Sequence, residues 1–158
     1  MTPSYLVVIP AALAMAGGVA VTGEALYFPG MALDRPVEVT LDASGMATVR
    51  AGSVSERRMT TPAERATLAA VVEATSFAKL SNLYGIGVID APVRSITVQV
   101  AGHSKRVGLH TLDARQMPRE QIQGAQRALR VYMAFRSLFP TFYNPGERAH
   151  DEAFLAIK

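Results

Sequence analysis

The sequence predicts an α+β protein. In it, an N-terminal apolar transmembrane helix precedes an antiparallel sheet of two hairpins covered by two helices. Three observations support this: an uncharged start, two alternating stretches that each contain a turn, and two stretches of helical periodicity. They divide the 158 residues into an anchor or uncleaved signal (1–23), a linker (24–35), an α+β domain (36–139) and a docking tail (140–158).

Residues 1–23 contain no Lys, Arg, Asp or Glu. Their apolar core, 5–22, is long enough for a helix to contact and cross the lipid bilayer. A cleaved secretory signal is the alternative. Small residues before a cut near Ala16 or Ala20 favour cleavage, whereas the missing basic start favours retention. A buried hydrophobic element of a soluble domain is the third interpretation.

The linker ends at Pro36, and a β-hairpin follows. Val37, Val39 and Leu41 alternate with polar residues, 43–45 form a turn, and 46–50 return. Residues 52–59 extend this hairpin as a third, polar edge element.

The first helix of the domain is predicted over 61–74. Thr61 is suited to cap it, Pro62 to occupy its first position, and Glu64 to complete a capping box. A loop over 81–87 then leads to the second hairpin, in which strands 93–100 and 106–109 flank a turn at 102–104.

The second helix is predicted from Pro118 to Phe139, because apolar residues recur there at helical spacing and Pro140 ends the pattern. The tail carries a turn at 143–146 and a short helix over 147–157. This helix is too small to bury its own apolar side chains, so we expect it to dock on its own domain or on a partner.

The amino-acid composition excludes some classes of function. The chain has no Cys, which excludes disulfides and thiolate-held metals, and its net charge of +3 is small. Its basic residues are dispersed along the chain, whereas nucleic-acid-binding proteins concentrate them on one surface. The sequence therefore predicts no nucleic-acid partner.

No motif indicates catalysis, and we predict no enzyme activity, catalytic residue, cofactor or metal ligand. The three histidines, His103, His110 and His150, lack metal-site spacing, and adjacent 150–152 do not face one centre on a helix. The alternative is a hydrolase that uses His103, His110 and Ser104, in which Ser104, His110 and Asp113 would form a triad. Asp90, before Ala91 and Pro92, is interpreted as a turn residue.

One resemblance covers about 36–139. Residues 70–80, Tyr84, 90–92 and 96–100 resemble a group of small, usually exported bacterial domains of unknown function. Their layout is similar to that of emfourin-type inhibitors of thermolysin-like peptidases. The resemblance implies an extracytoplasmic location.

The leading hypothesis is a non-enzymatic, single-pass membrane accessory subunit. Its domain lies on the periplasmic side and packs against a larger membrane protein complex, partly through the apolar tail. The alternative is a secreted or periplasmic binding module or peptidase inhibitor, released by signal cleavage.

Overall fold

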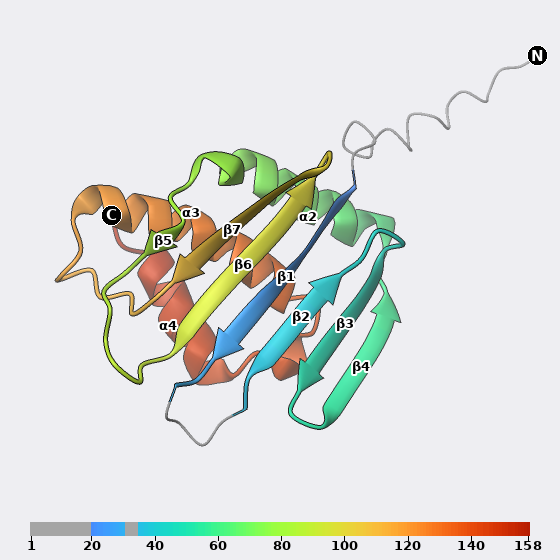
Figure 1. The fold of residues 1–158 in the computed structure, drawn as a ribbon, viewed down its shortest axis with the longest axis horizontal. Helices are drawn as coiled ribbons and strands as arrows, with labels where there is room; N and C mark the ends of the chain where they lie inside the picture. Colours follow the sequence, from blue (N-terminus) through green and yellow to red (C-terminus); the bar gives the residue numbers. More distant parts are fainter. Residues whose placement is uncertain (1–19, 31–34) are drawn as a thin grey trace, which may run out of the picture.

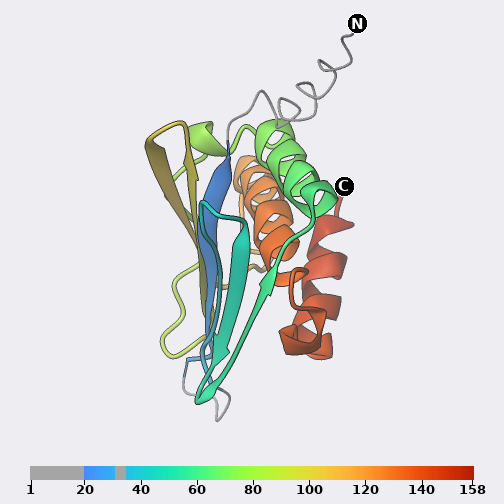
Figure 2. The ribbon, with the colours of Figure 1, turned by 90° about the vertical axis from the view of Figure 1, so that its right-hand side faces the viewer.

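The computed structural model describes residues 20–30 and 35–158. They form one seven-stranded mixed sheet with three α-helices on one of its faces (Figures 1 and 2). The strand order is β4-β3-β2-β1-β6-β7-β5, and all neighbours are antiparallel except β5 and β7. The prediction of an antiparallel sheet of two hairpins covered by two helices was therefore wrong, because the sheet is mixed, contains β1 and β5 in addition to the hairpins and their polar edge strand, and has three helices on one face.

Strand β1 (Val21–Phe28) lies at the centre of the sheet, between β2 (Val37–Leu41) and β6 (Val93–Val100). Its residues were assigned to the end of the apolar helix and to the linker, which was an error. Central pairing on both edges and the cover of α3 stabilise the strand despite its weak alternation. Gly23 shows how closely β1 is enclosed, since a Cβ there would lie 2.1 Å from the Thr97 carbonyl oxygen of β6 and 3.1 Å from Phe135 Cζ of α3.

The predicted transmembrane helix falls largely on residues 1–19, outside the described residues. Across 20–30 and 35–158, no helix combines the length and apolar character that crossing a membrane requires.

The first hairpin has the predicted strands and turn. Strands β2 and β3 (Met46–Ala51) pair through Val39↔Val49, and β4 (Val54–Met59) forms the polar edge. In the second hairpin, β6 pairs with β7 (His103–Leu109). Its tight turn is formed by Ala101 and Gly102, both at positive φ, so the turn falls just before the predicted position. The predicted loop also contains β5 (Leu83–Tyr84), held by parallel pairing with β7.

Helix α2 (Pro62–Ala74) has the predicted capping box between Thr61 and Glu64. A 3₁₀ turn, η1 (Phe77–Lys79), follows it. Helix α3 (Arg119–Arg136) packs against the sheet and against both other helices. After the 3₁₀ turn η2 (Pro140–Phe142) comes α4 (Pro145–Leu155), which confirms the short C-terminal helix.

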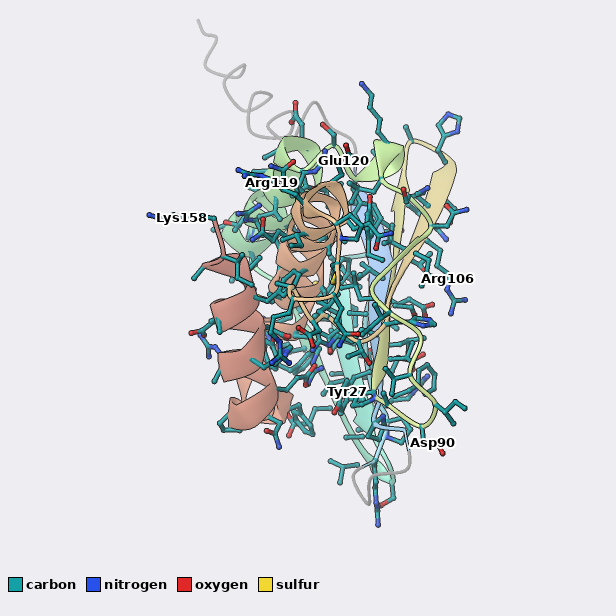
Figure 3. The ribbon with its side chains drawn as sticks, turned by 90° about the vertical axis from the view of Figure 1, so that its left-hand side faces the viewer. Tyr27, Asp90, Arg106, Arg119, Glu120 and Lys158 are labelled. Carbon is teal, nitrogen blue, oxygen red and sulfur yellow. The ribbon has the colours of Figure 1, made fainter. Side chains whose placement is uncertain are left out.

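The tail docks on its own domain. Phe139 and Phe154 are buried in the core, and the Gln126 side-chain amide donates to the Phe154 and Ile157 carbonyls at 3.0 and 2.8 Å. The opposite face of the sheet is uncovered and mostly polar. Figure 3 shows Arg106 extending from it, away from the helices.

Candidate functional site

Four charged side chains lie on the buried faces of three elements. Arg94 shares the helix-facing side of β6 with Ile96 and Val98, and Arg136 lies on the buried face of α3. Glu147 and Asp151 are one helical turn apart on α4. With Tyr132 and Tyr143 they form what we call the ion-pair cluster.

Arg136 is the centre of the cluster and is 1% exposed. It donates from Nη1 to the Tyr132 hydroxyl and to Glu147 Oε2 (3.1 Å), and from Nη2 to the Phe142 carbonyl (2.8 Å). Its guanidinium carbon lies 4.6 Å from the ring centroid of Tyr143, in cation–π geometry. These contacts fix the start of α4 against the end of α3.

Arg94 joins the same helix to the sheet. Its Nη2 lies 2.8 Å from Asp151 Oδ1, and its Nε lies 3.6 Å from Glu147 Oε2. Asp151 is completely buried and also accepts a hydrogen bond from the Tyr143 hydroxyl (2.5 Å). Two cations therefore face two carboxylates, which is the pairing that buried charges require.

The tyrosines of the cluster act as hydrogen-bond donors. Burial, which is the largest cause, and the neighbouring carboxylates raise the pKa of Tyr132 and of Tyr143 far above the usual range. Tyr132 donates to Glu147 Oε2 at 2.5 Å. Both phenols stay protonated at physiological pH, so neither serves as a general base there.

Two buried donor groups of the cluster, Arg94 Nη1 and Arg136 Nε, have no hydrogen-bond partner among the described residues, and neither has Thr111 Oγ1. The oxygens Glu147 Oε1 and Asp151 Oδ1 also lack aligned hydrogen bonds. Both nevertheless lie within 3.0 Å of a guanidinium nitrogen, so their charge is compensated. Unpaired buried donors are uncommon and mark a place where a further acceptor would be stabilised.

Beside the cluster is a cavity of about 520 Å³, which we call the sheet-end cavity. It lies where the ends of β1, β2, β3, β6 and β7 meet η2 and the start of α4. Its volume is within the range of small-molecule sites. The lining residues are Tyr27, Arg35, Val37, Ala51, Pro92, Arg94, His110, Thr111, Leu112, Arg136, Phe142, Asn144, Gly146, Glu147 and His150.

The structure separates the residues of the hydrolase alternative. His103 and Ser104 begin β7, whereas His110 follows its other end, so six residues of extended chain put about 20 Å between Ser104 and His110. Asp113 is held by Arg115 and Gln116. No Ser–His–Asp triad forms from these residues.

Of the histidines, His110 and His150 line the sheet-end cavity. Asp90 has a positive φ of 63° and is exposed, which agrees with a turn residue. Figure 3 shows it at the end of the sheet remote from Arg119 and Glu120. Within the described part of the chain, no three His, Asp or Glu side chains are grouped to hold a metal ion.

Sequence reasoning missed the cluster, although a signal for it exists. Arg94 occupies an inward position of an alternating strand, and Arg136 is one turn after Tyr132 on the apolar side of a helix. Glu147 and Asp151 are four residues apart, which places both on one face of the C-terminal helix. Charges at predicted core positions indicate buried ion pairs, since unpaired charges are rarely fully buried.

No protein-family model matches the chain, and no curated protein matches it either. The emfourin-like layout therefore stays a prediction.

Proposed function

We propose that this chain is a non-enzymatic binding module that takes a small ligand into the sheet-end cavity. The observation that carries the proposal is the unpaired Arg94 Nη1, together with Thr111 Oγ1, in residues that line a cavity of ligand size. Binding sites combine largely apolar walls with a few polar groups that fix orientation. In this cavity Val37, Ala51, Pro92, Leu112 and Phe142 supply the apolar wall, and charged and polar side chains supply the rest of the lining.

A binding role fits the chemistry of the cluster. Its carboxylates are paired with arginines, and its phenols remain protonated. Because these groups pair with one another, the donors without a partner among the described residues, Arg94 Nη1 and Thr111 Oγ1, are left to orient a ligand. The support is rigid, because the cluster connects β6, α3 and α4 through buried ion pairs and hydrogen bonds.

The hypothesis of an accessory subunit that docks through its tail has lost one of its supports. Phe139 and Phe154, which that hypothesis assigned to a partner contact, are buried in the domain itself. Packing against a larger membrane complex stays a prediction. Both candidate cleavage positions, Ala16 and Ala20, precede β1, so cleavage at either would leave the described sheet complete.

The test is a ligand screen by ¹⁵N–¹H NMR with the full chain, using a mixed library of small acids, amines and neutral fragments. We expect hits that shift the amides of Thr111, Gly146 and His150. Ala51→Phe, which fills the cavity from β3, should abolish these shifts. Ser55→Phe, on the exposed edge strand β4, is the matched control and should preserve them.

The proposal would be overturned by either of two results. One is a library that leaves the three amides unchanged at millimolar concentration. The other is a set of hits that binds the Ala51→Phe variant as tightly as the natural protein.

A further inference from the structure

We propose that the ligand of the sheet-end cavity is an organic monocarboxylate, with its carboxylate at Arg94 and Thr111 and an apolar body along the cavity wall. This inference rests on the proposed function and adds the chemical class of the ligand. It is argued from charge, donor geometry and wall composition.

The charge at the cavity favours an anion. Arg94 and Arg136 are balanced by Glu147 and Asp151. Arg35, at the rim, forms no ion pair with a described residue and adds one positive charge. A ligand with a single negative charge therefore brings the lining close to neutrality, whereas a cationic ligand meets an arginine-rich wall.

The donors suit a carboxylate in particular. Two nitrogens of Arg94 face acids of the cluster, and the third, Nη1, has no partner although the side chain is only 10% exposed. Thr111 Oγ1 is the second free donor. A carboxylate accepts from two donors at once through its two oxygens, and a guanidinium is its strongest partner among side chains.

A phosphate is disfavoured by the state of α4. Helix N-termini bind phosphates through free backbone N–H groups. Here the Asn144 side-chain oxygen already accepts from the N–H groups of Gly146 and Glu147, at 2.8 and 3.3 Å. The start of α4 therefore does not offer a phosphate the N–H groups of Gly146 and Glu147.

The remaining wall is suited to an apolar body. Val37, Ala51, Pro92, Leu112 and Phe142 contribute aliphatic and aromatic surface to the lining. A small inorganic anion would leave most of the cavity of about 520 Å³ unfilled. An aromatic or branched aliphatic acid would bury its apolar surface there, at roughly 25 cal/mol per Å².

The test is an NMR titration of the full chain with a series of phenyl-substituted acids, from phenylacetate to 5-phenylvalerate. Each acid is compared with its neutral amide, and phenyl phosphate is included. We expect at least one acid to shift the Thr111 amide and the Arg94 Nε–H saturably. Its amide should bind at least about tenfold more weakly, since a charge-assisted hydrogen bond is lost.

Thr111→Val supplies a variant that keeps the shape of the side chain. It should lower the affinity for the acid by about tenfold and leave the weak binding of the amide unchanged. Because Oγ1 has no partner in the described part of the chain, the thermal midpoint should stay the same or rise. Thr97→Val, on the uncovered face of β6, is the control and should not change affinity.

The outcomes distinguish a failure of the carboxylate proposal from a failure of the binding-module proposal on which it rests. Any of four results would overturn the proposal that the ligand is a carboxylate. They are equal affinity for acid and amide, tighter binding of phenyl phosphate, no saturable binding of any acid, and an affinity that Thr111→Val leaves unchanged. The binding module would stand if other library members still bound in the cavity and were blocked by Ala51→Phe. The binding-module proposal would be overturned together with the carboxylate proposal if no library member bound in the cavity.

Discussion

Arg94 on β6 and Asp151 on α4 form an ion pair inside the protein, with Nη2 and Oδ1 2.8 Å apart. The pair joins a central strand to the last helix, across the layer between sheet and helices. Asp151 is fully buried, so each charge depends on the other for compensation.

Removing one of these charges should be costly. We expect Asp151→Asn to lower the free energy of unfolding by about 3–5 kcal/mol, because Arg94 would remain buried without its strongest partner. Urea denaturation would measure the change. The control is Glu152→Gln. Glu152 is next to Asp151 and forms an exposed ion pair with Arg148, so this substitution should lower the free energy of unfolding by about 0.5 kcal/mol or less. Equal costs for the two variants would show that the buried pair is not needed.

The hydroxyl of Tyr143 should contribute measurably on its own. Tyr143→Phe removes a donor to a buried carboxylate, and we expect a loss of about 1.5–3 kcal/mol in the free energy of unfolding. Tyr84→Phe removes a hydroxyl that accepts from the neutral Ser81 N–H, so its cost should be nearer to about 1 kcal/mol. The prediction fails if the two variants are equally stable.

Gly23 should tolerate no side chain. The added methyl of Gly23→Ala would collide with the Thr97 carbonyl and touch Phe135, which we expect to cost about 1–3 kcal/mol. Gly87 has open space around its Cβ position and no positive φ, so Gly87→Ala is the matched control and should change stability by about 0.5 kcal/mol or less. Calorimetry on both variants would show whether β1 and α3 approach as closely as described.

Acid should remove the contribution of Glu64. Arg58, which donates to both its oxygens, and the Thr61 N–H lower the pKa of Glu64 from a usual 4.5 to about 2. The folded protein thus keeps this carboxylate ionised at a pH where the unfolded chain protonates it. The stabilisation is present above the unfolded pKa and is lost as the pH falls from 4.5 towards 2.

Glu64→Gln tests this dependence. Both side chains of the pair are about one third exposed, so solvent screening reduces the effect to about 1 kcal/mol. The gap in stability between the natural protein and the variant should close as the pH falls below the usual 4.5. Glu56→Gln, on the exposed edge strand, should show no such convergence. A gap for Glu64→Gln that is independent of pH would contradict the assignment.

Local sequence signals predicted the elements that depend on local chemistry. The capping box placed α2, Pro118 and Pro140 bounded α3, and alternation placed β2, β3 and β6. Strand β1 escaped prediction because its inward positions include Gly23 and Ala25, which carry little apolar signal. The two-residue β5 exists only through its pairing with β7, which no local pattern encodes.

The candidate site, too, contains parts that local sequence signals indicate and parts that they do not. Alternation on β6 and helical spacing on α4 mark Arg94 and Asp151 as inward-facing charges. The sheet-end cavity depends on the ends of five strands meeting η2 and α4. Such convergence is a property of the tertiary structure, so neither the cavity nor the unpaired donors could be inferred from the sequence.

The position of β1 also affects how the chain folds during synthesis. β1 leaves the ribosome first among the described strands, yet one of its edges pairs with β6 from Val21↔Val100 to Phe28↔Val93. At typical translation rates, that edge waits for its partner for roughly 4–14 s. During this time the unpaired edge of β1 is exposed to other chains. A protein with this strand order therefore benefits from a holding chaperone more than a simple meander of equal size would.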